Sequence, residues 1–252
     1  MIARDALASY LHDLLSCADF NDYAPNGLQV EGKTNIQRIC TAVTASAETI
    51  EHALVLQADA LLVHHGYFWR GEEPNITGMK RQRLGKLLTH DISLFAYHLP
   101  LDCHPEFGNN ASLAKRLNLS TTEMHRAGKT ANLLWSGVFG EPKVIPEFLS
   151  ELEQQLQRKP LHIAGKAKVI KRLAWCTGAA QDFIEDAYHL GADAYISGEI
   201  SERTYYQAKE LGIHYFACGH HATERYGIQE LGKHLAVNFQ LEHYFIDSSN
   251  PI

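Results

Sequence analysis

Five side chains in this sequence have the types and the positions expected of metal ligands. Imidazole and carboxylate donors without thiolate suit zinc, iron, manganese or nickel. The set follows predicted strands and consists of His64, His65, Asp102, His220 and Glu224. Neighbouring residues leaving a strand point in diverging directions, so His64 and His65 are expected to bind different ions. Three imidazoles and two carboxylates do not close two coordination shells unless a carboxylate bridges and water completes them, which is typical of a catalytic site.

Each of these residues also has a structural interpretation. A single histidine of the His64-His65 pair can be a hydrogen-bonded side chain beneath a turn at Gly66. Pro100 predicts an extended turn, after which Asp102 can act as a cap or turn residue. A helix beginning near Thr223 would make Glu224 a capping residue and leave His220 on the preceding loop. The shared position of all five after strands favours metal binding, whereas His221 is interpreted as a bystander.

An internal repeat predicts the elements that position these side chains. Residues 41–63 align with residues 175–197, and each copy reads as strand, amphipathic helix and buried strand. A further apolar strand follows each copy, at residues 92–97 and 213–218, and helices are expected near residues 110–117 and 227–235. The prediction is an α/β fold of two similar α/β domains with mostly parallel sheets and the metal site between them. The predicted domains are residues 1–126 and 127–252, with termini that can cross over.

Composition narrows the functional classes. The chain has 252 residues and a net charge of −6, which makes a dedicated nucleic-acid binder unlikely. Five scattered cysteines without a CxxC pair indicate neither a disulfide framework nor a thiolate zinc site. No apolar stretch approaches the roughly 20 residues of a membrane span, and the N-terminus reads as an amphipathic helix. We therefore expect a cytoplasmic protein with reduced thiols and no membrane partner.

Six ordered motifs resemble the NIF-three-like family, whose members are often labelled GTP cyclohydrolase type 2 homologues. They are DYAPNGLQVEG (22–32), VHHGYFW (63–69), HLPLD (98–102), GNNASLA (108–114), ISGEISE (196–202) and GHHATER (219–225). The resemblance implies a two-domain α/β subunit, a dinuclear metal centre and a homohexameric ring built as a trimer of dimers. Carried over by position, the ligands are again the five residues named above. The chain lacks the large middle insertion of longer relatives, so no role of that insertion transfers to it.

The preferred function is metal-dependent hydrolysis of a small nucleotide-like or heterocyclic substrate. Two divalent ions per subunit (Fe, Zn, Mn or Ni) are expected, with Glu224 among the catalytic residues and His98 as the proton-transfer group. GTP ring opening is the version that the family label suggests, although the sequence has no phosphate-binding loop. The alternative is a non-catalytic metal-binding or ring-shaped interaction protein.

Several other residues have less specific patterns. One interpretation of Tyr23, Asn26 and Gln29 is that they line the pocket. Glu199 aligns with the ligand position His65 in the repeat. The basic run of Lys80, Arg81, Arg83 and Lys86 can contact phosphate, but a solvated helix face is the preferred interpretation.

Overall fold

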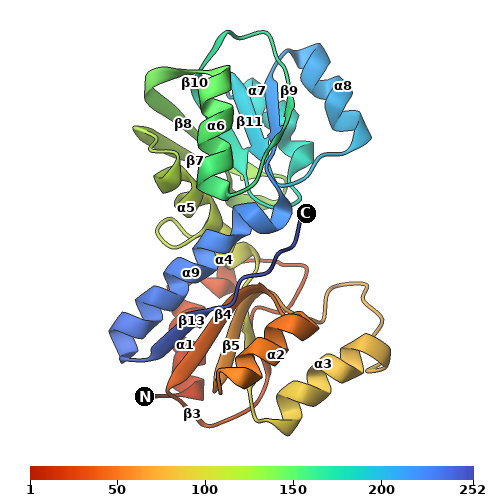
Figure 1. Ribbon diagram of the computed structural model, residues 1–252, viewed down its shortest axis with the longest axis vertical. Coiled ribbons are helices and arrows are strands. Elements are labelled where there is room, and N and C mark those ends of the chain that lie inside the picture. Colours follow the sequence, from red (N-terminus) through yellow and green to blue (C-terminus); the bar gives the residue numbers. More distant parts are fainter. The chain divides into compact units, whose positions relative to one another are not determined.

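A computed structural model describes residues 1–252 and divides the chain into two compact units (Figure 1). Unit 1 comprises Met1–Gly108 and Gly227–Ser249, and unit 2 comprises Asn109–Tyr226 and Asn250–Ile252. This division differs from the predicted boundary at residue 126. The apolar face of helix α5 (Asn109–Arg116) belongs to the core of unit 2, and the C-terminal strand returns to the sheet of unit 1.

Unit 1 contains a five-stranded sheet in the order β13-β4-β5-β6-β2. Its four parallel strands are β13 (Glu242–Phe245), β4 (Arg38–Thr44), β5 (Ala60–His65) and β6 (Ser93–Ala96), and β2 (Gly27–Val30) pairs antiparallel at the edge. A separate two-stranded ribbon joins β1 (Ile2–Ala3) to β3 (Asn35–Ile36). The carboxyl ends of β5 and β6 lead directly into the predicted ligand positions.

Successive residues along these strands face two different helical layers, as the two-residue period of a strand requires. Leu61 and Val63 pack with α2 (Ala47–Val55) and α3 (Gly78–Thr89). Ala60 and Leu62 pack on the other side with α1 (Arg4–Leu14), α4 (Leu99–Cys103) and the later turns of α9 (His220–Phe239). A sheet buried on both faces explains why β5 and β6 are continuous apolar runs in the sequence.

Unit 2 contains a six-stranded sheet in the order β7-β8-β10-β11-β12-β9. Its parallel centre is formed by β10 (Val169–Cys176), β11 (Ala194–Ser197) and β12 (His214–Ala217). Antiparallel strands flank this centre: β7 (Thr121–Ala127), β8 (Thr130–Val144) and β9 (Leu161–Ile163). Helices α5 and α6 (Ile145–Leu156) share one core with the sheet, while α7 (Ile184–His189) packs against α8 (Glu202–Leu211). Short 3-10 turns occur at Cys17–Asp19 and Gln181–Phe183.

The internal repeat is present in three dimensions as β4-α2-β5 and β10-α7-β11. Asp59 precedes β5, and its Oδ2 accepts hydrogen bonds from the backbone N–H groups of Gln37 and Arg38, each at 2.9 Å. Asp193 holds the corresponding position before β11, and its Oδ2 accepts from the N–H groups of Lys171 and Arg172 at 2.8 and 2.9 Å. The same carboxylate therefore ties together the same two strands in both units, which confirms two similar α/β units.

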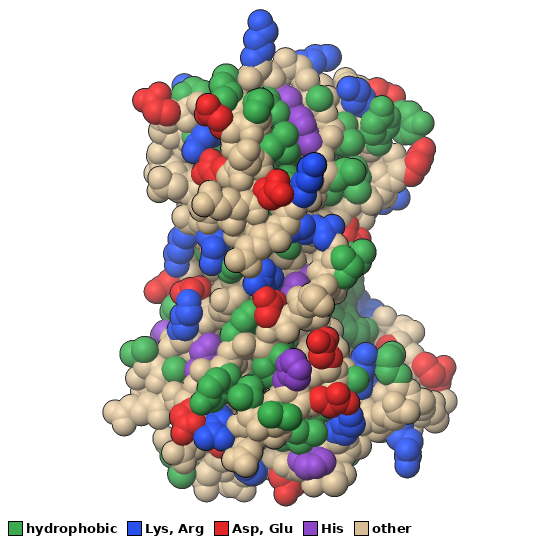
Figure 2. All heavy atoms as spheres, in the orientation of Figure 1, with side chains coloured by type: hydrophobic (Ala, Val, Ile, Leu, Met, Phe, Trp, Pro, Cys, Tyr) green, Lys and Arg blue, Asp and Glu red, His purple; other side chains and the backbone are tan.

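None of the helices has the length and apolar character needed to cross a membrane. On the face shown in Figure 2, Lys and Arg side chains are interspersed with Asp and Glu, and no continuous basic surface covers either unit. All five cysteines are buried and free.

Candidate metal centre

Unit 1 gathers three imidazoles at the carboxyl ends of two neighbouring parallel strands. His64 and His65 end β5, and His98 follows β6. Their ring centroids are 4.5 Å apart for His64 and His65 and 5.1 Å apart for His64 and His98. One nitrogen of each ring lies within 4.8 Å of one nitrogen of the others, which is close enough for a shared metal site. His64 is fully buried, whereas the other two imidazoles are partly exposed.

Hydrogen bonds at Nδ1 determine which nitrogen of each imidazole faces this cluster. The Nδ1 of His64 lies 2.9 Å from the carbonyl oxygen of Tyr97, so it must carry the proton and donate. The Nδ1 of His65 lies 3.2 Å from Thr44 Oγ1. In both residues Nε2 is left as the nitrogen available to an ion. An acceptor behind a metal-binding histidine commonly fixes its orientation in this way.

Asp102 adds a buried carboxylate to the same cluster. Its Oδ1 lies 3.5 Å from the Nε2 of His64, and the residue is only 5% exposed. The predicted extended turn at Pro100 is wrong, because Pro100 lies in the first turn of α4. Proline is compatible with that position, since the N–H it lacks would have no partner within the helix. Helix α4 thus turns Asp102 back toward His64.

Unit 2 contributes an imidazole and a carboxylate from one helix. Helix α9 begins at His220, not near Thr223, so His220 belongs to the first turn and not to a loop. His220 and Glu224 consequently stand four residues apart on one helix face. The Nε2 of His220 lies 3.2 Å from Glu224 Oε2, and Glu224 is 2% exposed. This geometry suits joint binding of one ion.

Glu199 stands behind His220 on the side away from Glu224. Its Oε1 accepts a hydrogen bond of 2.7 Å from the Nδ1 of His220, which leaves Nε2 toward Glu224. Burial disfavours the protonated imidazole, but the hydrogen bonds and charges of Glu224 and Glu199 outweigh it and raise the pKa of His220 to about 9. In the internal repeat Glu199 aligns with His65, but that alignment alone indicated no definite role for its side chain. The structure makes it a partner that orients a candidate ligand.

Two glycines leave the room that the unit 2 side chains occupy. A Cβ at Gly178 would lie 2.2 Å from Glu224 Oε1, and Gly178 has a φ of +70°. A Cβ at Gly198 would lie 2.7 Å from the Cα of His220. Side chains at these positions would therefore displace the candidate ligands. Sequence reasoning missed both glycines, because only the fold brings them against α9.

Asp22 is a further residue that sequence reasoning missed, and it supports His98. Its Oδ1 lies 2.8 Å from the Nδ1 of His98, and its Oδ2 accepts from Asn26 Nδ2 at 2.9 Å. Asn26 in turn accepts from the backbone N–H of His98 at 2.7 Å. Gln29 bonds to the backbone of Tyr67 and Pro25, and Tyr23 is 59% exposed, with its ring centroid 6.4 Å from that of His98.

The remaining candidates lie outside this arrangement. Lys80 belongs to α3, as the helical interpretation predicted, but its ammonium is paired with Glu72 at 3.2 Å and lies over the ring of Phe68. Burial raises the pKa of the Cys40 and Cys17 thiols to about 11 and that of Cys218 to about 12, so these thiols are not activated.

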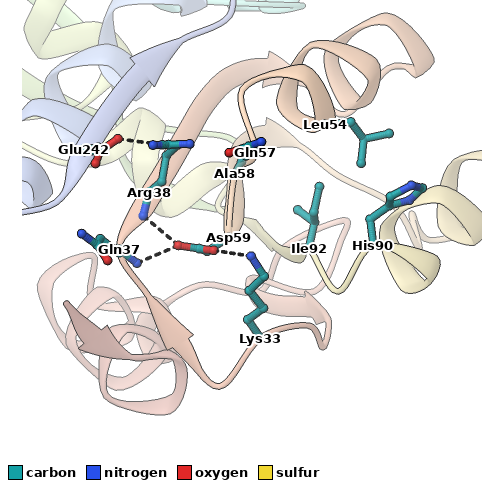
Figure 3. A pocket seen from close by; sticks show the side chains of 10 residues that line it. All are labelled: Lys33, Gln37, Arg38, Leu54, Gln57, Ala58, Asp59, His90, Ile92 and Glu242. Carbon is teal, nitrogen blue, oxygen red and sulfur yellow. Dashed lines mark hydrogen bonds and ion pairs between the residues drawn. The ribbon is translucent and has the colours of Figure 1, made fainter.

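A cavity of about 520 Å³ opens at the opposite edge of the unit 1 sheet, beside the amino ends of its strands (Figure 3). Its charged groups are already paired: Lys33 with Asp59 at 2.6 Å, and Arg38 with Glu242 at 2.7 Å. The cavity therefore has the character of a strand-end salt-bridge network and contains none of the candidate metal ligands.

The donor set fits divalent metal ions. His64, His98 and His220 each have Nδ1 engaged with a carbonyl or carboxylate oxygen, and Asp102 and Glu224 are buried carboxylates. Isolated buried carboxylates are costly unless they are paired with positive charge or bind metals. The two similar α/β units and these clusters define a two-domain protein with residues suited to metal binding.

Comparison with known proteins identifies the family. The model of the Duf34/NIF3 (NGG1p interacting factor 3) family matches residues 2–251, and the chain belongs to this family. A relative from Allochromatium vinosum named "GTP cyclohydrolase 1 type 2 homolog" is 51% identical over 245 residues, covering 97% of this chain and 96% of the relative. A Yersinia pestis protein of the same name is 50% identical over 246 residues, which make up 97% of this chain and 98% of the relative.

Solved structures show the same fold. One, described as protein ybgI of unknown function, superposes with a TM-score of 0.95 at 47% identity and full coverage of both chains. A protein from Thermus thermophilus gives a TM-score of 0.92 at 31% identity, also with full coverage of both chains. The family resemblance drawn from the six motifs is confirmed.

Proposed function

We propose that the chain is a dinuclear metal-dependent hydrolase that acts on a small nucleotide-like or heterocyclic substrate. The main support for this proposal is the orientation of the imidazole rings. The Nδ1 atoms of His64, His98 and His220 each face a fixed oxygen acceptor, which directs their Nε2 atoms away from that acceptor and toward the other candidate residues. A set of histidines oriented in this way favours metal binding over unrelated structural roles.

The proposed ligands are His64, His65, Asp102, His220 and Glu224, which bind two ions of Fe, Zn, Mn or Ni per chain. Unit 1 offers two imidazoles and one carboxylate, and unit 2 offers one of each. Neither group alone completes two shells of four to six ligands. The proposal is therefore that one site takes ligands from both units, with a carboxylate bridging the ions.

Bound divalent ions supply the chemistry of a hydrolase, because they lower the pKa of water toward neutrality. The chain's own residues then orient the reactants and move protons. His98 is the proposed proton-transfer group, since its ring stands beside His64 without belonging to the five ligands. The Trp69 ring lies 5.0 Å from His98, nearly perpendicular to it, and offers an aromatic surface to a planar heterocycle.

GTP is the first substrate to test, because the relatives carry the name of a GTP cyclohydrolase homologue. The experiment loads metal-free protein with Mn²⁺, Zn²⁺, Fe²⁺ or Ni²⁺, determines ions per chain by elemental analysis, and assays formate release from GTP and hydrolysis of related nucleotides. We expect two ions per chain and turnover that His64→Ala and Glu224→Ala abolish. His12→Ala, an exposed histidine on α1, is the matched control.

Two outcomes would contradict the proposal in different ways. One ion or fewer in a fully loaded sample would exclude the dinuclear site. Two bound ions without turnover of any nucleotide or heterocycle would instead favour the non-catalytic alternative, a metal-binding or interaction protein.

For the quaternary structure, we propose the six-subunit ring, a trimer of dimers, that the family resemblance implies. Light scattering coupled to size exclusion should then give about 170 kDa, six times the 28.3 kDa chain mass. A monomer or dimer mass at micromolar concentration would contradict it.

A further inference from the structure

A buried carboxylate holds His98 from behind. Asp22 comes from the loop before β2, 76 residues from His98 in the sequence, and its side chain is 3% exposed. Its Oδ1 accepts hydrogen bonds from His98 Nδ1 at 2.8 Å and from the Tyr23 N–H at 2.6 Å. Its Oδ2 accepts from the Leu99 N–H and from Asn26 Nδ2, each at 2.9 Å. Four donors therefore surround this carboxylate.

These contacts fix the ionisation of Asp22. Burial alone would raise its pKa, but the hydrogen bonds from His98, Asn26 and the Tyr23 N–H lower the pKa of Asp22 below its ordinary value. An ionised carboxylate can only accept, so the proton between Asp22 and His98 resides on the histidine Nδ1.

The opposite edge of the His98 ring faces the imidazole cluster. Its centroid lies 5.1 Å from that of His64 and 5.8 Å from that of His65, while Trp69 stands edge-on at 5.0 Å. The Asn26 side chain fixes the backbone of His98 through its N–H. The ring is thus held at its backbone and at Nδ1, and Nε2 is left to face the cluster.

We propose that Asp22 is a positioning residue that holds the proton of His98 on Nδ1 and so directs Nε2 at the site. This inference rests on the proposed function for what Nε2 does there. In that function Nε2 takes a proton from water or substrate and returns it to the leaving group of the product, so His98 is regenerated in each cycle.

Replacing Asp22 by asparagine tests the assignment, because the surrounding donors restrict how an amide can sit. The Leu99 N–H and the Asn26 amide both require an oxygen at the Oδ2 position. Oδ1 faces one obligatory donor, the Tyr23 N–H, whereas Oδ2 faces two, so the new NH₂ group is driven to the Oδ1 position at the cost of that one bond. There it faces His98 Nδ1 and can donate only if that nitrogen has lost its proton. Asp22→Asn should therefore move the proton of His98 from Nδ1 to Nε2. Asp19→Asn, an exposed carboxylate three residues earlier, is the matched control.

The first measurement is the tautomer of His98 in the metal-free protein at neutral pH, by long-range ¹H–¹⁵N NMR of the full chain. We expect a protonated Nδ1 in wild type and in Asp19→Asn, and a protonated Nε2 in Asp22→Asn. His98→Gln identifies the signals by their loss. A wild-type protein with the proton on Nε2, or an unchanged tautomer in a folded Asp22→Asn protein, would overturn the proposal. The wild-type spectrum by itself shows which nitrogen of His98 carries the proton, so the proposal is tested even if the variant does not fold.

The second measurement uses GTP with the Mn²⁺-loaded protein. Asp22→Asn should lower kcat by about 100-fold or more, as expected when a proton-transfer group is disabled, while KM and the number of bound ions stay unchanged. A change in KM with kcat intact would make Asp22 a substrate-binding element and overturn the positioning role. Absence of GTP turnover in wild type would count against the proposed function, whereas the tautomer measurement would still decide the role of Asp22.

Discussion

His220 illustrates how one residue acquires its function from two neighbours. Glu199 holds Nδ1 at 2.7 Å, and Glu224 lies 3.2 Å from Nε2. Without metal the imidazolium is stabilised, and the pKa of His220 reaches about 9 even though burial opposes the charge. A metal ion at Nε2 must displace that proton. Metal binding by His220 is therefore coupled to the release of a proton.

We predict that metal binding releases the His220 proton at neutral pH, so the affinity for Zn²⁺ rises as pH increases from neutrality to about 9. The sign follows from the raised pKa. In the metal-free protein, protonated His220 stabilises the fold below its unfolded pKa of about 6.5, and this contribution is lost as pH rises through about 9. Calorimetry in buffers of different ionisation enthalpy measures the proton release. An affinity that does not vary over this range would contradict the prediction.

Glu199→Gln should weaken Zn²⁺ binding by about 10- to 100-fold, the usual cost of removing a partner behind a metal-binding histidine. It should also lower the pKa of His220 and reduce the pH dependence of binding, because one of the two stabilising charges is gone. Glu202→Gln, an exposed carboxylate at the start of α8, is the control for charge. Equal affinities for the two variants would assign Glu199 no role in orienting His220.

At the scale of elements, the strands that lead into the candidate ligands were predictable, whereas the turns after them were not. The strands that bear the ligands are continuous apolar runs, and burial on both faces of a sheet requires that pattern. The start of α9 was missed because the residue directly before His220 is Gly219, which has a φ of +96°, a backbone conformation that local sequence patterns do not reveal. Helix α4 was missed because Pro100 also suits an extended turn. Asp22 could not be found from spacing, since only the folded loop brings it to His98.

The edge strand β9 is joined to β12 by a pair of histidines that should make stability depend on pH. His162 Nε2 lies 3.0 Å from His214 Nδ1, which also accepts from the Gly165 N–H, while His214 Nε2 faces the Ala167 carbonyl at 2.8 Å. The pattern requires His162 to donate from Nε2 and His214 to accept at Nδ1. Burial, and then His214, lowers the pKa of His162, so its contribution is present above the unfolded pKa of about 6.5 and is lost as pH falls below it.

We predict that His162→Phe costs about 1 kcal/mol at pH 7.5, the value of one net hydrogen bond, and that this cost shrinks toward pH 5.5. The phenyl ring can keep the stacking on Phe216, whose centroid lies 4.6 Å from the imidazole. Urea unfolding at several pH values measures the difference, with the exposed His12→Gln variant as control. A cost that stays constant between pH 7.5 and 5.5 would show that His162 does not titrate in this way.

Helix α3 provides a test of the basic run. Arg81 is exposed, so Arg81→Gln should change the free energy of unfolding by less than about 0.5 kcal/mol. Lys80 is paired with Glu72 and lies over Phe68, so Lys80→Gln should cost up to about 1 kcal/mol. Neither variant should alter GTP turnover. A large loss of turnover in a folded Arg81→Gln protein would instead indicate a phosphate-binding role.

At the scale of the whole molecule, the internal repeat could be predicted from the sequence, but the boundary between the two units could not. Asp59 and Asp193 occupy matching positions in sequence and in structure, which made two similar units predictable. The division at Gly108 was not predictable, because α5 carries a helical pattern that fits either core. The sequence allowed the termini to cross over, but it did not predict the pairing of β13 with β4, since pairing between residues 242–245 and 38–41 leaves no trace in local composition.

If both units supply ligands to one centre, metal should stabilise the whole chain as a single body. Ligand at a hundredfold excess over its dissociation constant adds about 2.7 kcal/mol, which corresponds to a rise in Tm of about 5 to 10 °C for a chain of this size. If Glu224 is the carboxylate that would bridge the two ions, Glu224→Ala should abolish this rise and the binding of both ions. His64→Ala should chiefly weaken one ion and retain part of the rise. His12→Ala should behave as wild type in calorimetry with and without Zn²⁺. A full metal-induced rise in a protein lacking both His64 and His65 would show that the second unit binds metal alone, and the shared site would then be wrong.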